Sequence, residues 1–384
     1  MRDQKSPASD LQSAWGPELL TSMSSSWDDL FQRADEPFLS SSSTWCRVSW
    51  ETVAEPRGRQ LFSLTQSRGG RLTLVWPFVV YRRLGVKIAQ PLTSEASEYS
   101  SVLVDPGVAN EALVLECLKR VAEETKCDVI RLQYTPCDSL LHAAAIQLKR
   151  PSHLWHIPAP WIASGDVSEW TSYESRFTRQ QRSERRRRRR RLEELGPVLF
   201  GLEPLDTRGE AIDWVLQQKA TWLERKQLSN DWLHTSEYRA FLQALAREPT
   251  AYGELAVFSL RARGQMIAAE VGAVTESRCE MLIATYDPAY ATYAPGELLR
   301  EESIRWAAGR DLSYDFRVGA ESYKERWASR IRDVVSMEYA MSPRGRLFIA
   351  AKRTFLAVPA SGQGRLKAGL RQVESFLSGA RRKR

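Results

Sequence analysis

The sequence lacks a long apolar run. Its longest apolar stretches, residues 75–81 and 347–358, are interrupted by Pro77 and by the pair Lys352 and Arg353. A helix that crosses a bilayer needs about 20 consecutive apolar residues, so neither stretch predicts a membrane span. The start of the chain also lacks the apolar segment of a secretory signal peptide. We therefore expect a cytoplasmic protein.

Cysteine and histidine are scarce, and neither is arranged in a ligand motif. The 5 cysteines contain no C-x-x-C pair and the 4 histidines contain no H-E-x-x-H motif, although zinc sites commonly draw on such close pairs. We therefore expect free thiols in a reducing compartment and no metal. The cysteines are Cys46, Cys117, Cys127, Cys137 and Cys279.

The length of 384 residues exceeds the usual size of one domain, which favours two domains or a duplicated one. Periodicity predicts a similar order of elements in both halves. In the first half we expect helices at 27–34 and 111–125 and strands at 60–65, 71–81 and 128–133. In the second half we expect helices at 170–195, 210–225, 236–246 and 297–308, and strands at 197–202, 254–261, 265–274, 280–286 and 312–316. This mixture predicts the α/β class.

The formal charge of +8 is concentrated in two segments. Residues 176–191 hold ten arginines and one acid, and residues 344–384 hold eleven basic residues and one acid, so the rest of the chain is acidic. The arginine block is expected within a helix, where it forms a solvated face or contacts phosphates. The end of the chain predicts a basic amphipathic helix, which suits an anionic membrane surface, or else a mobile solubilising tail.

The stretch from Met281 to Trp327 organises the rest of the chain. A short apolar strand ends near Tyr286, and Pro295 and Gly296 precede a helix that ends at Gly309. Proline and glycine suit the start of a helix, where free backbone amides can bind an anion such as a pyrophosphate. Proline and glycine are also common at ordinary helix boundaries and turns that bind no ligand.

Four segments carry a family resemblance: YDPAYATYAPGELL, YDFRVGAESYKERW, FTRQQRSERRRRRRRLEELGPVLF and SWDDLFQRADEPFLSSSSTW. From about Trp27 to Met341 the chain resembles the cellulose-biosynthesis-protein-like (BioF2-like) acetyltransferases. These are related to the Gcn5-related N-acetyltransferases (GNAT) and to the Fem aminoacyltransferases. The resemblance implies tandem GNAT halves, each a mixed, mostly antiparallel sheet flanked by helices. The expected parts are a mobile leader at 1–25, a degenerate GNAT-like domain at 26–160, a GNAT acyltransferase domain at 161–343 and a basic tail at 344–384.

The resemblance also implies where an acyl-CoA donor would lie. In related acetyltransferases the pyrophosphate sits at the start of the helix after the central meander, and the thioester lies along the preceding strand. The family's turn usually reads Q/R-x-x-G-x-G/A, and this chain departs from it with YAPG at 293–296. Carried over, the donor site comprises Tyr286, Ala294, Pro295, Gly296, Leu298 and Leu299.

Acyl transfer to an amine needs a base for the nucleophile and an acid for the leaving thiolate. Glu270 is the only acid in its apolar strand, so burial should raise its pKa, and it is our first choice as base. The alternative is that Glu270 points to solvent. Tyr323 stands where related enzymes often carry a tyrosine that protonates the thiolate, although core packing with Trp327 would also explain it. Asp315 and Glu321 are alternative bases.

Lys324, Arg185 and Arg188 are the expected substrate-binding residues, because each offers a cation to a phosphate or carboxylate. The resemblance implies transfer of an acetyl or other acyl group from acyl-CoA to an amine or hydroxyl of a polar acceptor, linked to envelope or polysaccharide metabolism in a bacterial-type cytoplasm. Two alternatives stay open. One is Fem-like aminoacyl transfer from charged tRNA, and the other is a non-catalytic protein that binds nucleic acid or a membrane.

Overall fold

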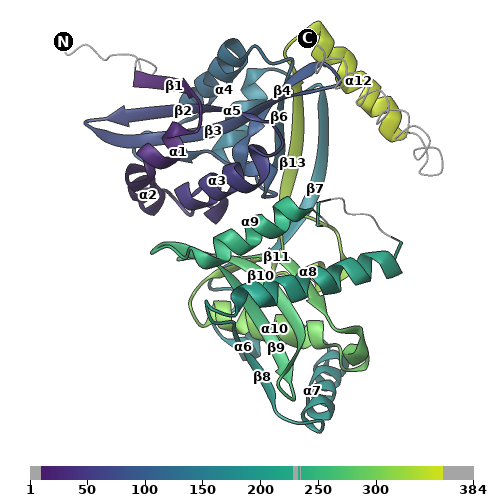
Figure 1. Ribbon diagram of the computed structural model, residues 1–384. Helices are drawn as coiled ribbons and strands as arrows, with labels where there is room; N and C mark the ends of the chain where they lie inside the picture. The colour runs from purple at the N-terminus through teal and green to yellow at the C-terminus, as the bar shows by residue number, and fades with distance from the viewer. Residues whose placement is uncertain (1–9, 228–231, 234, 358–384) are drawn as a thin grey trace. The chain divides into compact units, whose positions relative to one another are not determined.

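The structure, a computed structural model, describes residues 10–227, 232–233 and 235–357. Its contacts divide the chain into two compact units (Figure 1). Unit 1 is Met1–Ile157 with Asp333–Arg384, and unit 2 is Pro158–Arg332. No helix in these described ranges is long and apolar enough to cross a membrane.

Unit 1 is a mixed sheet flanked by helices. Its strands are β1 (Leu11–Trp15), β2 (Gln60–Arg68), β3 (Arg71–Arg83), β4 (Val86–Pro91), β5 (Leu103–Val104), β6 (Val129–Pro136), the start of β7 (His153–Ile162) and most of β13 (Arg330–Ala340). The spatial order is β1-β2-β3-β4-β6-β13-β7, with β5 against β3. Strands β4 and β6 are parallel, whereas β1 to β4 are antiparallel neighbours and β13 is antiparallel to β6.

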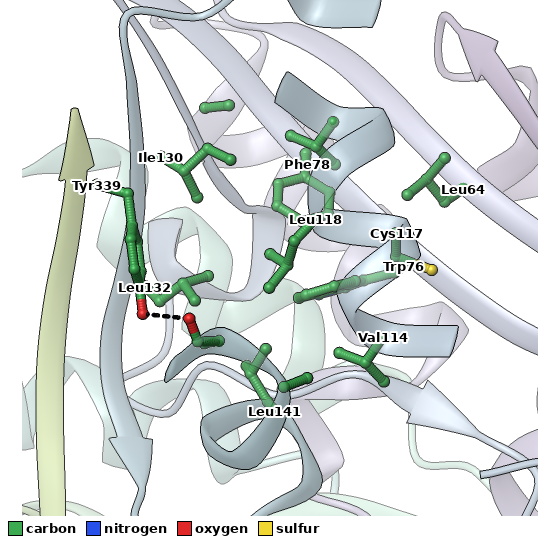
Figure 2. Packing of buried hydrophobic residues seen from close by; sticks show 14 of the residues in the cluster. Leu64, Trp76, Phe78, Val114, Cys117, Leu118, Ile130, Leu132, Leu141 and Tyr339 are labelled. Carbon is green, nitrogen blue, oxygen red and sulfur yellow. Dashed lines mark hydrogen bonds between the residues drawn. The ribbon is translucent and has the colours of Figure 1, made fainter. Parts of the chain in front are cut away.

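The helices of unit 1 cover this sheet. They are α1 (Glu18–Ser22), α2 (Ser24–Arg33), α3 (Ser43–Ser49), α4 (Glu111–Thr125), α5 (Leu140–Leu148) and α12 (Pro343–Ala357), with short turns η2 (Leu39–Ser41), η3 (Trp50–Ala54) and η4 (Leu92–Glu95). Helix α4 confirms the expected span, and the Asn110 side chain caps it by accepting from the Leu113 amide. Figure 2 shows Leu118 of α4 among Trp76, Phe78 and Leu132 of the sheet.

Helix α12 takes up the first part of the basic tail and is docked on unit 1. Ile349 is buried against Val86, Ile88 and Val129, and Lys352 Nζ lies 2.8 Å from Glu338 Oε1. The rest of the expected tail, residues 358–384, lies outside the described residues. The sequence places residues 11–22 in a leader, whereas in the structure they form β1 and α1, because Leu11 and Leu20 find apolar partners.

Unit 2 is a second mixed sheet with helices. Its strands are β8 (Val198–Leu202), β9 (Gly253–Ala262), β10 (Gln265–Thr275), β11 (Arg278–Tyr286) and β12 (Ser313–Asp315). Its helices are α6 (Trp170–Glu174), α7 (Arg179–Glu193), α8 (Arg208–Arg225), α9 (Ser236–Arg247), η5 (Pro288–Tyr293), α10 (Pro295–Ala308) and α11 (Ser322–Trp327). The order is β8-β9-β10-β11-β12, antiparallel except for parallel β11 and β12, and the end of β7 pairs with β12.

The two units share one arrangement. Each has a three-stranded antiparallel meander, then a helix, then a strand parallel to the last meander strand: β2-β3-β4, α4 and β6 in unit 1, and β9-β10-β11, α10 and β12 in unit 2. The expected fold class, α/β with tandem GNAT halves, is confirmed. The sequence assigns residues 333–343 to the second domain, whereas in the structure β13 pairs with β6 of unit 1 from Val334 to Ala340.

Candidate active site

Strand β11 extends past the end of its neighbour β12. It pairs with β10 from Cys279 to Tyr286, with a bulge at Leu282, but it pairs with β12 only from Arg278 to Glu280. No described strand pairs with this edge of β11 between Met281 and Tyr286. Backbone groups on an unpaired strand edge can bind an extended ligand. This edge is therefore the candidate position for an acyl donor.

The start of α10 lies at the end of that edge. The helix begins at Pro295, two residues before the expected start, and Ala294 before it has a left-handed backbone (φ 47°). Pro295 has no amide hydrogen, and the amides of Glu297 and Leu298 donate to the Ala294 carbonyl at 2.9 and 3.3 Å. Anion binding at this helix start therefore depends on the Gly296 amide. The helix start thus offers fewer free amide donors than the sequence suggests.

The predicted donor residues separate into two groups. Tyr286 is exposed, Ala294 and Gly296 are partly exposed, and a Cβ atom on Gly296 would lie 3.4 Å from Tyr286 Cδ1, so these residues meet at one corner beside the buried Pro295. Leu298 and Leu299 are instead each 1% exposed and belong to the core beneath α10. Their side chains cannot touch a donor in this conformation.

Glu270 on β10 is buried, and this excludes the solvent-facing alternative. Its strand neighbour Phe258 packs edge-on against Trp306 of α10, so Glu270 faces the same helix. The Tyr314 hydroxyl donates to Glu270 Oε1, while Oε2 has no hydrogen-bond partner among the described residues. Burial raises the pKa of Glu270, and the nearby Arg300 guanidinium and the Tyr314 hydrogen bond oppose that rise only in part.

The other predicted catalytic groups do not all lie near Glu270. Tyr323 stacks its ring on the Arg300 guanidinium at 4.2 Å, and Arg300 also acts electrostatically on Glu270. Asp315, in contrast, accepts from the Arg317 amide at 2.6 Å. Asp315 follows Tyr314 on β12, and successive strand residues face opposite sides of a sheet. Asp315 therefore lies on the side of the sheet away from Glu270.

Lys324 is buried and bonded within the unit. Its Nζ donates to the Val318 carbonyl at 2.7 Å and lies 3.1 Å from Glu321 Oε2. A buried, bonded ammonium has little freedom to bind a substrate, but it can hold the loop before α11 in place. Glu321, weighed as an alternative base, is the exposed partner of that pair.

Lys219 of α8 belongs to the site although no sequence motif singles it out. Its Nζ lies 3.4 Å from the Ala284 carbonyl of β11 and over the Trp222 ring at 4.6 Å. Burial lowers its pKa, and Glu321 acts against that effect. Lys219 thus places a partly desolvated cation at the strand that carries the open edge. Its helix and β11 are far apart in sequence, so only the fold reveals the contact.

The arginine block of α7 is mostly neutralised inside unit 2. Arg185 is buried, its guanidinium lies 3.5 Å from Glu174 and 3.1 Å from Glu301, and it stacks on Phe177 and Trp327. It is therefore unavailable to a substrate. Arg188 pairs with Glu184 and, at 3.0 Å, with Glu297, and Arg189 pairs with Glu302. The basic face of α7 thus covers an acidic face of α10, instead of offering phosphate contacts on all sides.

A small cavity in unit 2 lies away from this corner. It is lined by residues between Ile162 and Ser168, by Ile304 and Ala308 of α10, and by Tyr314 of β12. The open edge of β11 and the start of α10 do not contribute to it. The candidate site is therefore defined by the unpaired edge of β11 and by the exposed groups at the start of α10, and not by a cavity.

Comparisons with known proteins support a GNAT assignment. Residues 179–325 match the family model described as "Acetyltransferase (GNAT) domain", whereas a search of curated proteins gave no significant match. The crystal structure of FemX is similar with a TM-score of 0.58 and 9% identity, covering 81% of this chain and 95% of that chain.

Two further structures are similar over most of the chain. The C-terminal domain of a putative lysylphosphatidylglycerol synthetase from Agrobacterium fabrum has a TM-score of 0.52 at 11% identity, with coverages of 87% and 95%. L-PGS from Bacillus licheniformis has a TM-score of 0.52 at 12% identity, with coverages of 87% and 96%. Such low identities show the fold alone. Residues 179–325 are thus similar to the GNAT acetyltransferase domain, and the fold of the chain is similar to that of FemX.

Proposed function

We propose that the protein is an acyltransferase that moves an acetyl or other acyl group from acyl-CoA to an amine or hydroxyl of a polar acceptor. The resemblance to BioF2-like acetyltransferases suggests an acceptor from envelope or polysaccharide metabolism. The observation that carries the proposal is the open edge of β11 beside the partly exposed start of α10. The match of residues 179–325 to the GNAT domain supports the same chemistry.

In this proposal the donor lies along β11 from Met281 to Tyr286, with its pyrophosphate at the Gly296 amide. The lone pair of the acceptor attacks the thioester carbon, and the carbon–sulfur bond breaks. Glu270 is the base for the proton of the attacking group, which has to reach its buried, unbonded Oε2 through a bound water molecule or a local opening beneath α10, and Tyr323 protonates the leaving thiolate. Lys219 supplies positive charge near the donor, whereas Arg188 is paired with Glu184 and Glu297 and serves to hold α7 against α10.

The variant Gly296→Trp tests the donor site. An indole at this position would extend into the corner that Tyr286 occupies, so acetyl-CoA binding measured by calorimetry should be lost. Gly209→Trp is a matched control at the start of α8, because no atom lies within 4 Å of a Cβ built there. Wild-type protein that binds no CoA at millimolar concentration, or a folded Gly296→Trp that binds it normally, would contradict the proposal.

A second candidate function, aminoacyl transfer from charged tRNA, is favoured by the chemistry of the α10 start. Pro295 removes one amide there, and Glu297 places a carboxylate in the first turn, which opposes phosphates. Exposed arginines of α7 would then contact the tRNA backbone. Replacing Arg186, Arg187 and Arg190 by Gln leaves the buried Arg185 intact and should reduce the salt slope of tRNA binding by about 0.7–0.9 per lost contact.

Parallel assays with acetyl-CoA and aminoacyl-tRNA decide between the two donors. Transfer from acetyl-CoA with no tRNA affinity supports the first function, and salt-sensitive tRNA binding with transfer of the amino acid supports the second. A folded protein that binds RNA or vesicles and transfers from neither donor would point to a non-catalytic binding protein.

The basic end of the chain supports a proposed location at the inner face of an anionic membrane. Residues 358–384 contain seven basic residues and one acid, Glu374. A chain that ends at residue 357 keeps all of α12, so its fold should be unchanged. We expect the full chain to sediment with vesicles that contain anionic lipid at low salt, and the shortened chain to stay in the supernatant. Equal sedimentation of both chains would contradict this role.

A further inference from the structure

Three potential metal ligands meet in unit 1, although they are far apart in sequence. Cys137 directly follows β6, His156 lies on β7, and Asp333 lies on β13. Their ligand atoms all lie within 4.8 Å of one another. Among the described residues, these three side chains form a group of histidine, cysteine and carboxylate ligands that is close enough to hold a metal ion.

The sheet itself holds these residues together. Strand β13 pairs with β6 up to Val334 opposite Pro136, and the Cys137 amide then donates to the Asp333 carbonyl at 2.9 Å. His156 Nδ1 lies 2.9 Å from Asp333 Oδ2. The backbone therefore fixes the thiol beside the carboxylate, and the side-chain contact brings the imidazole to both.

We propose that Cys137, His156 and Asp333 bind one Zn²⁺ ion. Thiolate and imidazole are ligands that select zinc over magnesium or calcium, and a carboxylate completes a common three-ligand set. Zinc bonds of about 2.0–2.3 Å place tetrahedral ligand atoms roughly 3.3–3.6 Å apart, which side-chain rotation reaches from the present spacing. Asp138 adds a second negative charge near the thiol, which favours a cation.

The site is open on one side. The side chains of His156 and Asp333 are each 57% exposed, so an ion can enter without unfolding of the sheet. Three protein ligands leave a fourth position for water or another small ligand. An ion held there would link β7 and β13 to the end of β6, and it should stabilise unit 1 because it binds the folded state alone.

The test uses the full untagged chain, stripped with a chelator and titrated with Zn²⁺ in a calorimeter. We expect one ion per chain. Cys137→Ser and His156→Ala should each weaken binding by more than the roughly 10–100-fold effect of losing an outer-shell partner. His153→Ala is the matched control, because His153 lies on the same strand and outside the three-ligand group; its affinity should be unchanged.

Cobalt provides an independent readout. Co²⁺ bound to the wild-type chain should show a thiolate-to-metal absorption band in the near ultraviolet, and Cys137→Ser should lack it. Thermal unfolding in the presence of chelator checks that each variant is folded. A folded variant should unfold at the same midpoint temperature as the metal-free wild type. If Cys137→Ser is misfolded, Asp333→Asn and His156→Ala carry the test. Absence of Zn²⁺ binding, or a folded ligand variant that binds as tightly as the wild type, would overturn the proposal.

Discussion

Glu270→Gln should lower kcat for acyl transfer by about 10²–10⁴-fold, the usual contribution of a general base. Glutamine keeps the shape of Glu270 and its contact with the Tyr314 hydroxyl, but it cannot take a proton. Donor affinity, measured by calorimetry, should stay unchanged because Glu270 lies beneath α10 and away from the Gly296 corner. Steady-state kinetics with the donor that the parallel assays select provide the measurement.

The control for this variant is Glu276→Gln, which changes an exposed acid in the turn between β10 and β11. It should leave kcat unaltered. A folded Glu270→Gln that retains full activity would assign Glu270 a structural role only.

Stability against pH supplies a second signature of Glu270. Its pKa is raised from 4.5 in the folded protein, so the folded state binds more protons than the unfolded state between 4.5 and that raised value. The stability of the wild type should therefore fall as pH rises through this window, relative to Glu270→Gln. Activity should rise over the same window, because the base must be ionised to act. Parallel pH curves for the two proteins would contradict the shift.

Arg185→Ala should destabilise the protein by about 3–5 kcal/mol, as expected when one partner of a buried ion pair is removed. The Arg185 side chain is 4% exposed, and its loss leaves Glu174 and Glu301 without their shared cation. It also removes the stacking on Phe177 and Trp327. Chemical denaturation followed by circular dichroism measures the change in the free energy of unfolding.

Arg187→Ala is the matched control in the same helix. Arg187 is 60% exposed and pairs with Glu184 at the surface, so its removal should cause little change in the free energy of unfolding. Similar losses for the two variants would show that Arg185 does not act as a buried anchor. A large loss for Arg185→Ala alone would explain why part of the arginine run cannot serve as a ligand site.

Local patterns in the sequence were enough for the α/β class and for many elements, but they did not predict β1, β4, β7 or β13. The 3.6-residue spacing of Leu113, Val114, Leu118 and Val121 predicted α4, and all four are buried in its core cluster. The apolar strand around Glu270 left a buried and a solvent-facing carboxylate both open, and the structure shows the buried one. These predictions succeed because periodicity and turn residues act over a few positions along the chain.

Other features were decided by contacts between distant segments. The arginine run carries no sign that Arg185 turns inward to Glu301, 116 residues away. No local pattern predicts three further contacts between distant segments. These are the contact of Lys219 with the Ala284 carbonyl, the pairing of β13 with β6, and the contact of His156 with Asp333.

The sequence by itself determined the α/β class, many of the helices and strands, and the acidic residue placed inside an apolar strand. The tertiary structure decided which charges are neutralised, which strand edge stays open and which side chains meet. The physical reason is that hydrophobic spacing fixes the face that an element buries, whereas the partner of that face depends on strand pairing and helix packing across the whole chain.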